Sequence, residues 1–231
     1  MKKGKFIVID GTDGSGKATQ TALLVEALKK KKVKVKKIDF PRYYDNFFGK
    51  LIGECLSGLY GDFAATDPHI ASVLYAADRW ESSAQIKKWL DRGYTIIADR
   101  YVSSNQIHQG GKLRDLAERE RFLGWLDKME HGIFKIPRPD AIVYLHLEVQ
   151  LTLGLLKEKS LAQKKRYAEG RGDMVENNLK YLEDSRESAM YIVKRLNNWH
   201  QIECSKDGGV LSKQEIHDLV FKKEKKILKL K

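Results

Sequence analysis

A glycine-rich loop near the N-terminus has the residue types and spacing of a phosphate-binding loop. Residues 11–17 read Gly-Thr-Asp-Gly-Ser-Gly-Lys and fit the pattern G-x-x-x-x-G-K. Glycines let the backbone turn its N–H groups inward around an anion, and Lys17 can reach the outer phosphates of a nucleotide. An ordinary glycine-rich turn is the alternative, but a lysine at this spacing favours phosphate binding. The predicted phosphate-binding residues are Gly11, Asp13, Gly14, Ser15, Gly16, Lys17, Ala18 and Thr19.

The residue after the lysine departs from the pattern, because Ala18 stands where serine or threonine is usual. The missing hydroxyl normally helps to hold Mg²⁺. Thr19 does not replace it, since one step along a helix turns the side chain by about 100°. Either another protein oxygen or water takes this place, or the phosphate chemistry is impaired. The first alternative is favoured because Mg²⁺ commonly keeps several waters.

Arginine, aspartate and amide side chains gather in short segments further along the chain. Each has a plain explanation when taken singly, since arginines are often solvated, an Asp-Arg pair can be a structural ion pair, and asparagine favours turns. Taken in order, they indicate one site that positions and neutralises phosphate groups, because arginine binds phosphate oxygens bidentately. The segments are Asp-Phe-Pro-Arg at 39–42, Leu-Tyr-Ala-Ala-Asp-Arg-Trp at 74–80, Asp-Arg-Tyr at 99–101, Ser-Ser-Asn at 103–105 and Gln-Gly at 109–110.

The elements that must position these residues are short apolar strands alternating with helices. Runs rich in β-branched residues predict strands at 6–9, 33–38, 95–98, 141–145 and 201–204. Apolar residues at helical spacing predict helices at 19–32, 51–59, 70–90, 116–129, 149–159, 178–196 and from 213 to the end. This alternation indicates an α/β fold with a parallel sheet flanked by helices, in which ligands bind beyond the carboxyl ends of the strands. Without a repeat or a linker, residues 1–231 are predicted to form a single domain.

This series of segments, in this order, resembles the thymidylate kinase family of P-loop enzymes, which phosphorylate dTMP. The resemblance continues through Arg-Pro-Asp at 138–140 to a helix that holds Glu176, Tyr181 and Arg186, and so covers most of the chain. It implies the fold of P-loop nucleoside monophosphate kinases with a small mobile lid. It also implies transfer of the γ-phosphoryl group of ATP to dTMP, use of Mg²⁺, and a homodimer formed through apolar helix faces such as that of residues 70–90.

The resemblance assigns roles at the phosphates. It implies that Asp13 contacts the 3′-hydroxyl of the acceptor sugar and that Arg42 and Arg79 hold the acceptor phosphate. Asp99 would act next to Mg²⁺ as a metal ligand, and Arg100 would span the donor and acceptor phosphates. Because the attacking group is already a phosphate oxygen, Asp99 is better interpreted as a metal-binding or arginine-orienting carboxylate than as a general base.

It also assigns roles at the base and sugar of dTMP. Tyr75, where the family usually has phenylalanine, would stack on the thymine. Asn105 and Gln109 fall in the segment that recognises the base and sugar, and Phe40 belongs to the same set. His108 occupies a position where the family tends to place an aromatic ring near the sugar. These residue types leave open a kinase for another deoxynucleotide or deoxynucleoside.

A basic segment at 157–173 lies where these kinases carry their lid. Gly170 and Gly172 give it the backbone freedom of a hinge. The alternative is a solvated basic loop. Since the phosphate loop holds no arginine, the chain resembles members whose catalytic arginine comes from the lid, and Arg166 and Arg171 are the two candidates.

Charge and composition limit the partners. The chain of 231 residues has 43 Lys and Arg against 31 Asp and Glu, a net charge of +12, which indicates an anionic partner. ATP and dTMP account for the smaller part of this charge, which lies in the motifs. The larger part lies in the basic runs at 29–37 and 222–226, which are interpreted as a solvated face rather than a nucleic-acid site, because no series of stacking aromatic residues accompanies them. A nucleotide-binding regulator without catalysis remains a less favoured alternative. With only Cys55 and Cys204, no signal peptide and no membrane-spanning run, the sequence predicts a cytoplasmic protein.

Overall fold

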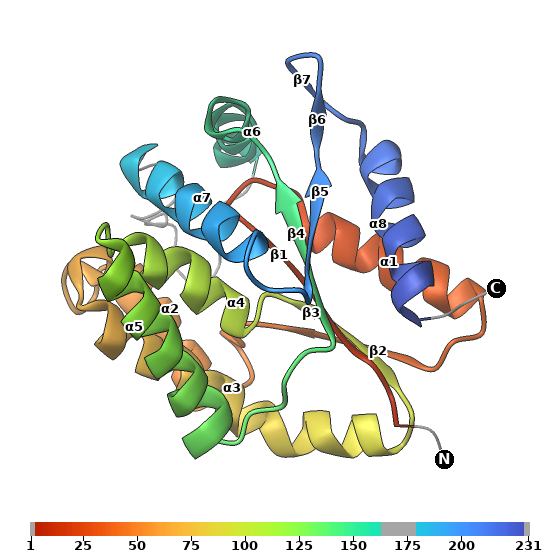
Figure 1. The fold of residues 1–231 in the computed structure, drawn as a ribbon, viewed down its shortest axis with the longest axis horizontal. Coiled ribbons are helices and arrows are strands. Elements are labelled where there is room, and N and C mark those ends of the chain that lie inside the picture. Colours follow the sequence, from red (N-terminus) through yellow and green to blue (C-terminus); the bar gives the residue numbers. More distant parts are fainter. Residues whose placement is uncertain (1–2, 163–178, 229–231) are drawn as a thin grey trace.

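A computed structural model, which describes residues 3–162 and 179–228, contains a five-stranded parallel sheet with helices on both faces (Figure 1). The strand order is β2-β3-β1-β4-β5, and every pairing is parallel. The predicted fold class is therefore confirmed. The strands are β1 (Phe6–Gly11), β2 (Val35–Asp39), β3 (Thr95–Asp99), β4 (Ala141–His146) and β5 (Trp199–Glu203).

Alternate residues of each central strand enter two separate cores, because successive side chains of a strand point to opposite faces. In β1, Phe6 and Val8 belong to one core, while Ile7 and Ile9 belong to the other. The first core is completed by α3 (Pro68–Asp91), α5 (Leu116–Asp127) and α7 (Leu179–Val193). The second is completed by α1 (Lys17–Lys30), α6 (Val149–Ala162) and α8 (Lys213–Leu228). Burial on both faces explains why these strands are continuously apolar.

Some predicted boundaries were wrong, and short elements were missed. The second strand is Val35–Asp39 rather than 33–38, and helix α2 is Phe47–Leu56 rather than 51–59. The sequence predicted neither the short helix α4 (Val102–Ser104) nor the π-helices η2 (Asn105–Gln109) and η3 (Lys128–Ile133). The 3₁₀ turn η1 (Phe63–Ala65) and the hairpin of β6 (Ser205–Lys206) and β7 (Gly209–Val210) were also missed. Such short turns have no periodicity to detect.

The strand register brings the chemistry-bearing segments to one edge of the sheet. Asp99 lies opposite Ile9 of β1 and opposite Asp39 of β2. The phosphate loop, the segment after β2 and the segment after β3 therefore start side by side. Most of the predicted lid, including Arg166 and Arg171, lies outside the described residues, and its first residues, 157–162, continue α6. In the described part of the chain, no helix combines the length and apolar character needed to cross a membrane.

Candidate active site

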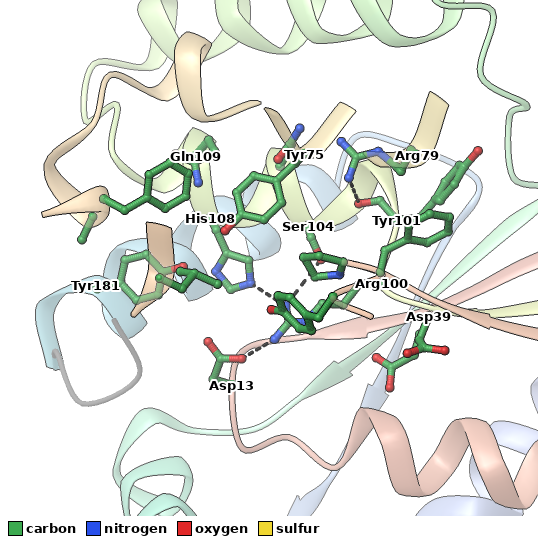
Figure 2. Close-up of a pocket in the computed structure, with 18 of the residues that line it drawn as sticks. Asp13, Asp39, Tyr75, Arg79, Arg100, Tyr101, Ser104, His108, Gln109 and Tyr181 are labelled. Atoms are coloured by element: carbon green, nitrogen blue, oxygen red, sulfur yellow. Dashed lines mark hydrogen bonds and ion pairs between the residues drawn. The ribbon is translucent and has the colours of Figure 1, made fainter. Parts of the chain in front are cut away.

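A cavity of about 280 Å³ opens at the carboxyl ends of β1, β2 and β3 (Figure 2). It joins most of the side chains that the sequence predicted for the acceptor: Asp13, Phe40, Tyr75, Arg79, Asp99, Arg100, Asn105, His108 and Gln109. Asp39, from the Asp-Phe-Pro-Arg segment, also lines it. The sequence did not indicate several other lining residues, namely Tyr43, Leu56, Phe63, Ala64 and Lys112. These come from turns and from helix α2, where no motif distinguished them.

The phosphate loop turns at two glycines with left-handed backbone angles. Gly14 and Gly16 have φ of 83° and 88°, a region that other residues rarely adopt. Gly16 is followed directly by α1, whose first N–H groups favour an anion. Lys17 is buried, and its Nζ donates to the carbonyl of Thr12 at 2.8 Å. Burial, together with the nearby Arg100 charge, lowers the pKa of Lys17 to about 8.

Arg100 lies between the phosphate loop and the cavity. Its backbone has φ of 64°, an unusual value for a residue other than glycine. Its guanidinium donates to Asp13 and lies 3.0 Å from Nε2 of His108; Figure 2 shows it between these two side chains. Burial alone would lower the pKa of Arg100, but Asp13, Asp10 and Asp99 raise it well above its ordinary value. The side chain is thus a fixed positive charge at the junction of two predicted phosphate sites.

Asp10, which the sequence did not single out, holds the segments next to Arg100 together. It is fully buried at the end of β1 and accepts hydrogen bonds from the hydroxyls of Ser103 and Ser104. These serines belong to α4, directly after the Asp99-Arg100 segment. Asp10 therefore ties α4 to the phosphate loop and lies 3.9 Å from Nη1 of Arg100. The only available signal was an aspartate at a predicted strand end.

Two aspartates are direct neighbours in the register of β2 and β3. Asp39 and Asp99 both line the cavity. Burial raises the pKa of Asp99, although Lys17 and Arg100 partly oppose the shift. Carboxylate oxygens are donors that Mg²⁺ prefers, so these residues fit a magnesium ion. Among the described residues there is no group of three or more His, Cys, Asp or Glu side chains that could hold a metal ion.

The other end of the cavity is aromatic and amide-rich. Tyr75 of α3 lies 6.0 Å from the ring of Phe63. Arg79, one turn further along α3, forms two hydrogen bonds with Glu130, from Nε at 2.7 Å and from Nη2 at 2.6 Å. Asn105 also donates to Glu130, at 3.0 Å. The positive charge of Arg79 is therefore paired with the carboxylate of Glu130, which no sequence signal revealed.

His108 connects Arg100 to helix α7. Its Nδ1 lies 3.2 Å from Oγ of Ser185, and its ring stacks on Tyr181 with centroids 5.5 Å apart. Burial, followed by the Arg100 charge, lowers the pKa of His108 to about 4. The imidazole is thus neutral near pH 7, accepting from Arg100 through Nε2 and donating to Ser185 through Nδ1.

Arg42 is the one residue predicted for the acceptor that does not line this cavity. Its guanidinium donates to Asp45 at 3.0 Å and to Ser82 at 3.2 Å. Its backbone N–H donates to the buried carboxylate of Asp78 on α3, which fixes the segment after β2.

Gln109 is buried at the cavity, and its Oε1 has no hydrogen-bond partner among the described residues. A buried oxygen of this kind is available to a ligand.

The fold and site together define a class: a phosphate loop runs from a buried parallel strand into a helix, beside a cavity at the neighbouring strand ends. This is the fold of P-loop nucleoside monophosphate kinases. The sequence model of the family described as "Thymidylate kinase" matches residues 9–216. The chain belongs to the thymidylate kinase family.

Individual relatives agree with this placement. The chain is 36% identical to a thymidylate kinase of Plasmodium falciparum over 146 residues, which are 63% of this chain and 63% of that protein. It is 32% identical to a human thymidylate kinase over 149 residues, 64% of this chain and 63% of that protein. Each match thus spans less than two thirds of the relative's length. The solved thymidylate kinase of Candida albicans has the same fold, with a TM-score of 0.69 at 24% identity over 98% of this chain and 92% of that chain.

Proposed function

We propose that this protein transfers the γ-phosphoryl group of ATP to dTMP, giving dTDP and ADP. The position of Arg100 carries the proposal, because its guanidinium is bound to Asp13 of the phosphate loop and also lines the acceptor cavity. A fixed cation at that junction is within reach of donor and acceptor phosphates alike. Membership of the thymidylate kinase family supports the choice of acceptor.

The reaction needs positioning and charge neutralisation more than acid–base chemistry. A phosphate oxygen of dTMP, already ionised at neutral pH, attacks the γ-phosphorus of ATP. The bond from that phosphorus to the bridging oxygen breaks, and the electron pair leaves with ADP. Lys17 and Arg100 neutralise the negative charge that spreads over the phosphoryl oxygens. Arg166 and Arg171 stay the candidates for a further arginine from the lid.

Mg²⁺, which would be held by Asp99 with Asp39 beside it, neutralises phosphate charge when it is bound. This pair offers hard oxygen donors without a hydroxyl at position 18, so Ala18 does not remove the metal from the proposal. Asp99 has a second task, because its carboxylate contributes to the high pKa of Arg100. It helps to keep that guanidinium charged.

The end of the cavity that holds Tyr75, Arg79 and Asn105, called the base end from here on, suits a neutral, hydrogen-bonding ring. Because Glu130 meets the charge of Arg79, this arginine fits a neutral carbonyl oxygen better than the acceptor phosphate suggested by the resemblance. Tyr75 and Phe63 provide aromatic surface on the same cavity. We therefore assign Arg79, Asn105 and Tyr75 to the thymine, and leave the acceptor phosphate to Arg100, with Arg42 if it leaves its present partners.

We also propose that the protein acts as a homodimer in the cytosol. Helix α3 exposes Ile70, Val73 and Trp80, with exposed fractions of 59%, 37% and 55%. Large apolar side chains that gather on one exposed helix face favour a protein partner. Cys55 and Cys204 are both buried and free, as is usual in a reducing compartment.

The test is a panel of acceptors with ATP, measured with and without Mg²⁺. The panel contains dTMP, dUMP, dCMP, dGMP and thymidine. We expect Mg²⁺-dependent ADP formation with the highest kcat/KM for dTMP. A higher value for another acceptor would replace dTMP in the proposal. Absence of ADP formation with every acceptor would remove the catalytic function and favour a nucleotide-binding regulator.

A further inference from the structure

Glu130 is a fully buried carboxylate placed between two residues of the base end. It lies in η3, more than twenty positions from either partner, and has no exposed surface. It accepts from Nε and Nη2 of Arg79 and from Nδ2 of Asn105. Both partners line the cavity, whereas Glu130 is not among its lining residues. Glu130 therefore acts on a ligand only through Arg79 and Asn105.

The orientation of the Asn105 amide follows from its two partners. Its Nδ2 donates to Glu130 Oε1 at 3.0 Å and to the carbonyl of Ser72 at 3.2 Å. Both partners are acceptors only, so the amide nitrogen must face them. The group that Asn105 still has to offer is Oδ1, which is a hydrogen-bond acceptor.

The hydrogen bonds of Arg79 likewise determine what it can offer to a ligand, which in its case is N–H donors. Its Nε and one N–H of Nη2 are used by Glu130, and Nη1 donates to the carbonyl of Tyr101 at 3.3 Å. A guanidinium has five N–H donors, so one remains on each terminal nitrogen. With its charge met by Glu130, Arg79 is a donor suited to a neutral oxygen.

We propose that Glu130 sets the hydrogen-bond polarity of the base end and so determines which pyrimidine is selected. Arg79 as donor and Asn105 as acceptor match an edge with a ring carbonyl next to a ring N–H, as in thymine. Cytosine presents an amino group next to a bare ring nitrogen, which places donor against donor and acceptor against acceptor. Glu130 is a positioning residue, and this inference rests on the proposed phosphorylation of dTMP.

The test is Glu130→Gln, assayed with dTMP and dCMP. The glutamine amide can present an N–H group to Asn105, so the carboxylate no longer fixes the Asn105 amide and only the carbonyl of Ser72 still favours its original orientation. We expect the ratio of kcat/KM for dTMP to that for dCMP to fall about tenfold or more, because matched groups become unpaired. The KM for ATP should not change, since Glu130 is bonded to Arg79 and Asn105 and not to a residue of the phosphate loop.

The matched control is Glu187→Gln, which removes another glutamate that pairs with an arginine, Arg119 at 3.1 Å, and neither residue of this pair lines the cavity. It should leave the ratio unchanged. A purely structural role for Glu130 would lower Tm and reduce kcat/KM for both nucleotides alike. A folded Glu130→Gln variant that retains the wild-type ratio therefore overturns the inference.

A second variant serves if Glu130→Gln does not fold. Glu130→Asp keeps acceptor oxygens only but shortens their reach, so we expect the KM for dTMP to rise several-fold while dTMP remains preferred. An unchanged KM in that variant also overturns the inference. Wild-type protein that does not prefer dTMP would instead contradict the proposed function itself, so the two failures are distinguishable.

Discussion

At the scale of single residues, the most informative side chain is Lys17, because its charge depends on what occupies the phosphate loop. In the ligand-free protein, burial and the Arg100 charge lower its pKa to about 8. A bound polyphosphate favours the charged ammonium and raises that pKa. The proposed binding of ATP is therefore expected to be coupled to protonation of Lys17.

This coupling predicts a pH dependence of nucleotide binding. Below pH 8 Lys17 is mostly charged before ATP arrives, and above pH 8 it must take up a proton on binding. We expect the Kd for ATP to rise as pH increases above about 8, with proton uptake at pH 8.5 and less at pH 7. Calorimetry in two buffers of different ionisation enthalpy measures this uptake. Lys17→Met is the control, and equal uptake by that variant would assign the proton to another group.

Residues differ in how far the sequence revealed them. Lys17, Asp99 and Arg100 were predictable because each belongs to a local motif at a strand end. Asp10 and Glu130 were not, because their roles depend on partners far away along the chain. The separation is at least 93 positions for Asp10 and its two serines, and at least 25 positions for Glu130. A buried carboxylate in a helix has no distinguishing neighbours in the sequence.

At the scale of elements, helix α8 contains a buried acid at its interface with the rest of the second core. Glu224 has no exposed surface, and neither of its carboxylate oxygens has a hydrogen-bond partner among the described residues. It follows Ile216 and Val220 at intervals of four, so it lies on the buried face of the helix. Burial raises its pKa to about 8.

The raised pKa predicts that Glu224 costs stability at neutral pH. At pH 4 the carboxyl is mostly protonated in both states and the cost is small. Between its ordinary pKa and about 8 only the unfolded chain releases the proton, so the free energy of unfolding falls as pH rises. We expect Glu224→Gln to add roughly 1–3 kcal/mol at pH 7.5 and little at pH 4.

Urea unfolding at the two pH values measures this difference. The control is Asp218→Asn, an exposed acid on the same helix, which should change the free energy of unfolding by less than about 0.5 kcal/mol. An equal gain from Glu224→Gln at both pH values would contradict the ionisation argument and indicate a packing effect.

At the scale of the whole molecule, helix ends account for part of the positive charge that the phosphate loop and the cavity do not use. Helices α1 and α8 lie side by side (Figure 1), and Gln20 near the start of α1 donates to the carbonyl of Lys213 at the start of α8. The last turns of these helices hold Lys29 and Lys30 in α1, and Lys225 and Lys226 in α8. Cations are favourable at helix C-termini. These lysines therefore need no polyanionic partner.

The exposed apolar face of α3 predicts the assembly state. We expect wild-type protein to be a dimer at micromolar concentration, and Ile70→Glu to shift it toward monomer, because a buried unpaired charge opposes association. Light scattering after size-exclusion chromatography measures the mass. Leu219→Glu, on α8 with an exposed fraction of 40%, is the control and should remain dimeric. A monomeric wild type would contradict the dimer.

The sequence by itself determined the α/β class, the order of most elements and the phosphate loop, because hydrophobic periodicity and a contiguous motif are local properties. It also determined which arginines and aspartates would follow the strand ends. Only the tertiary structure decided which of them meet: Arg100 with Asp13 and His108, and Arg79 with Glu130. The physical reason is that hydrogen bonds and desolvation act between groups close in space, whatever their separation along the chain. Glu130 could be given a role only once the fold had placed it beside Arg79 and Asn105.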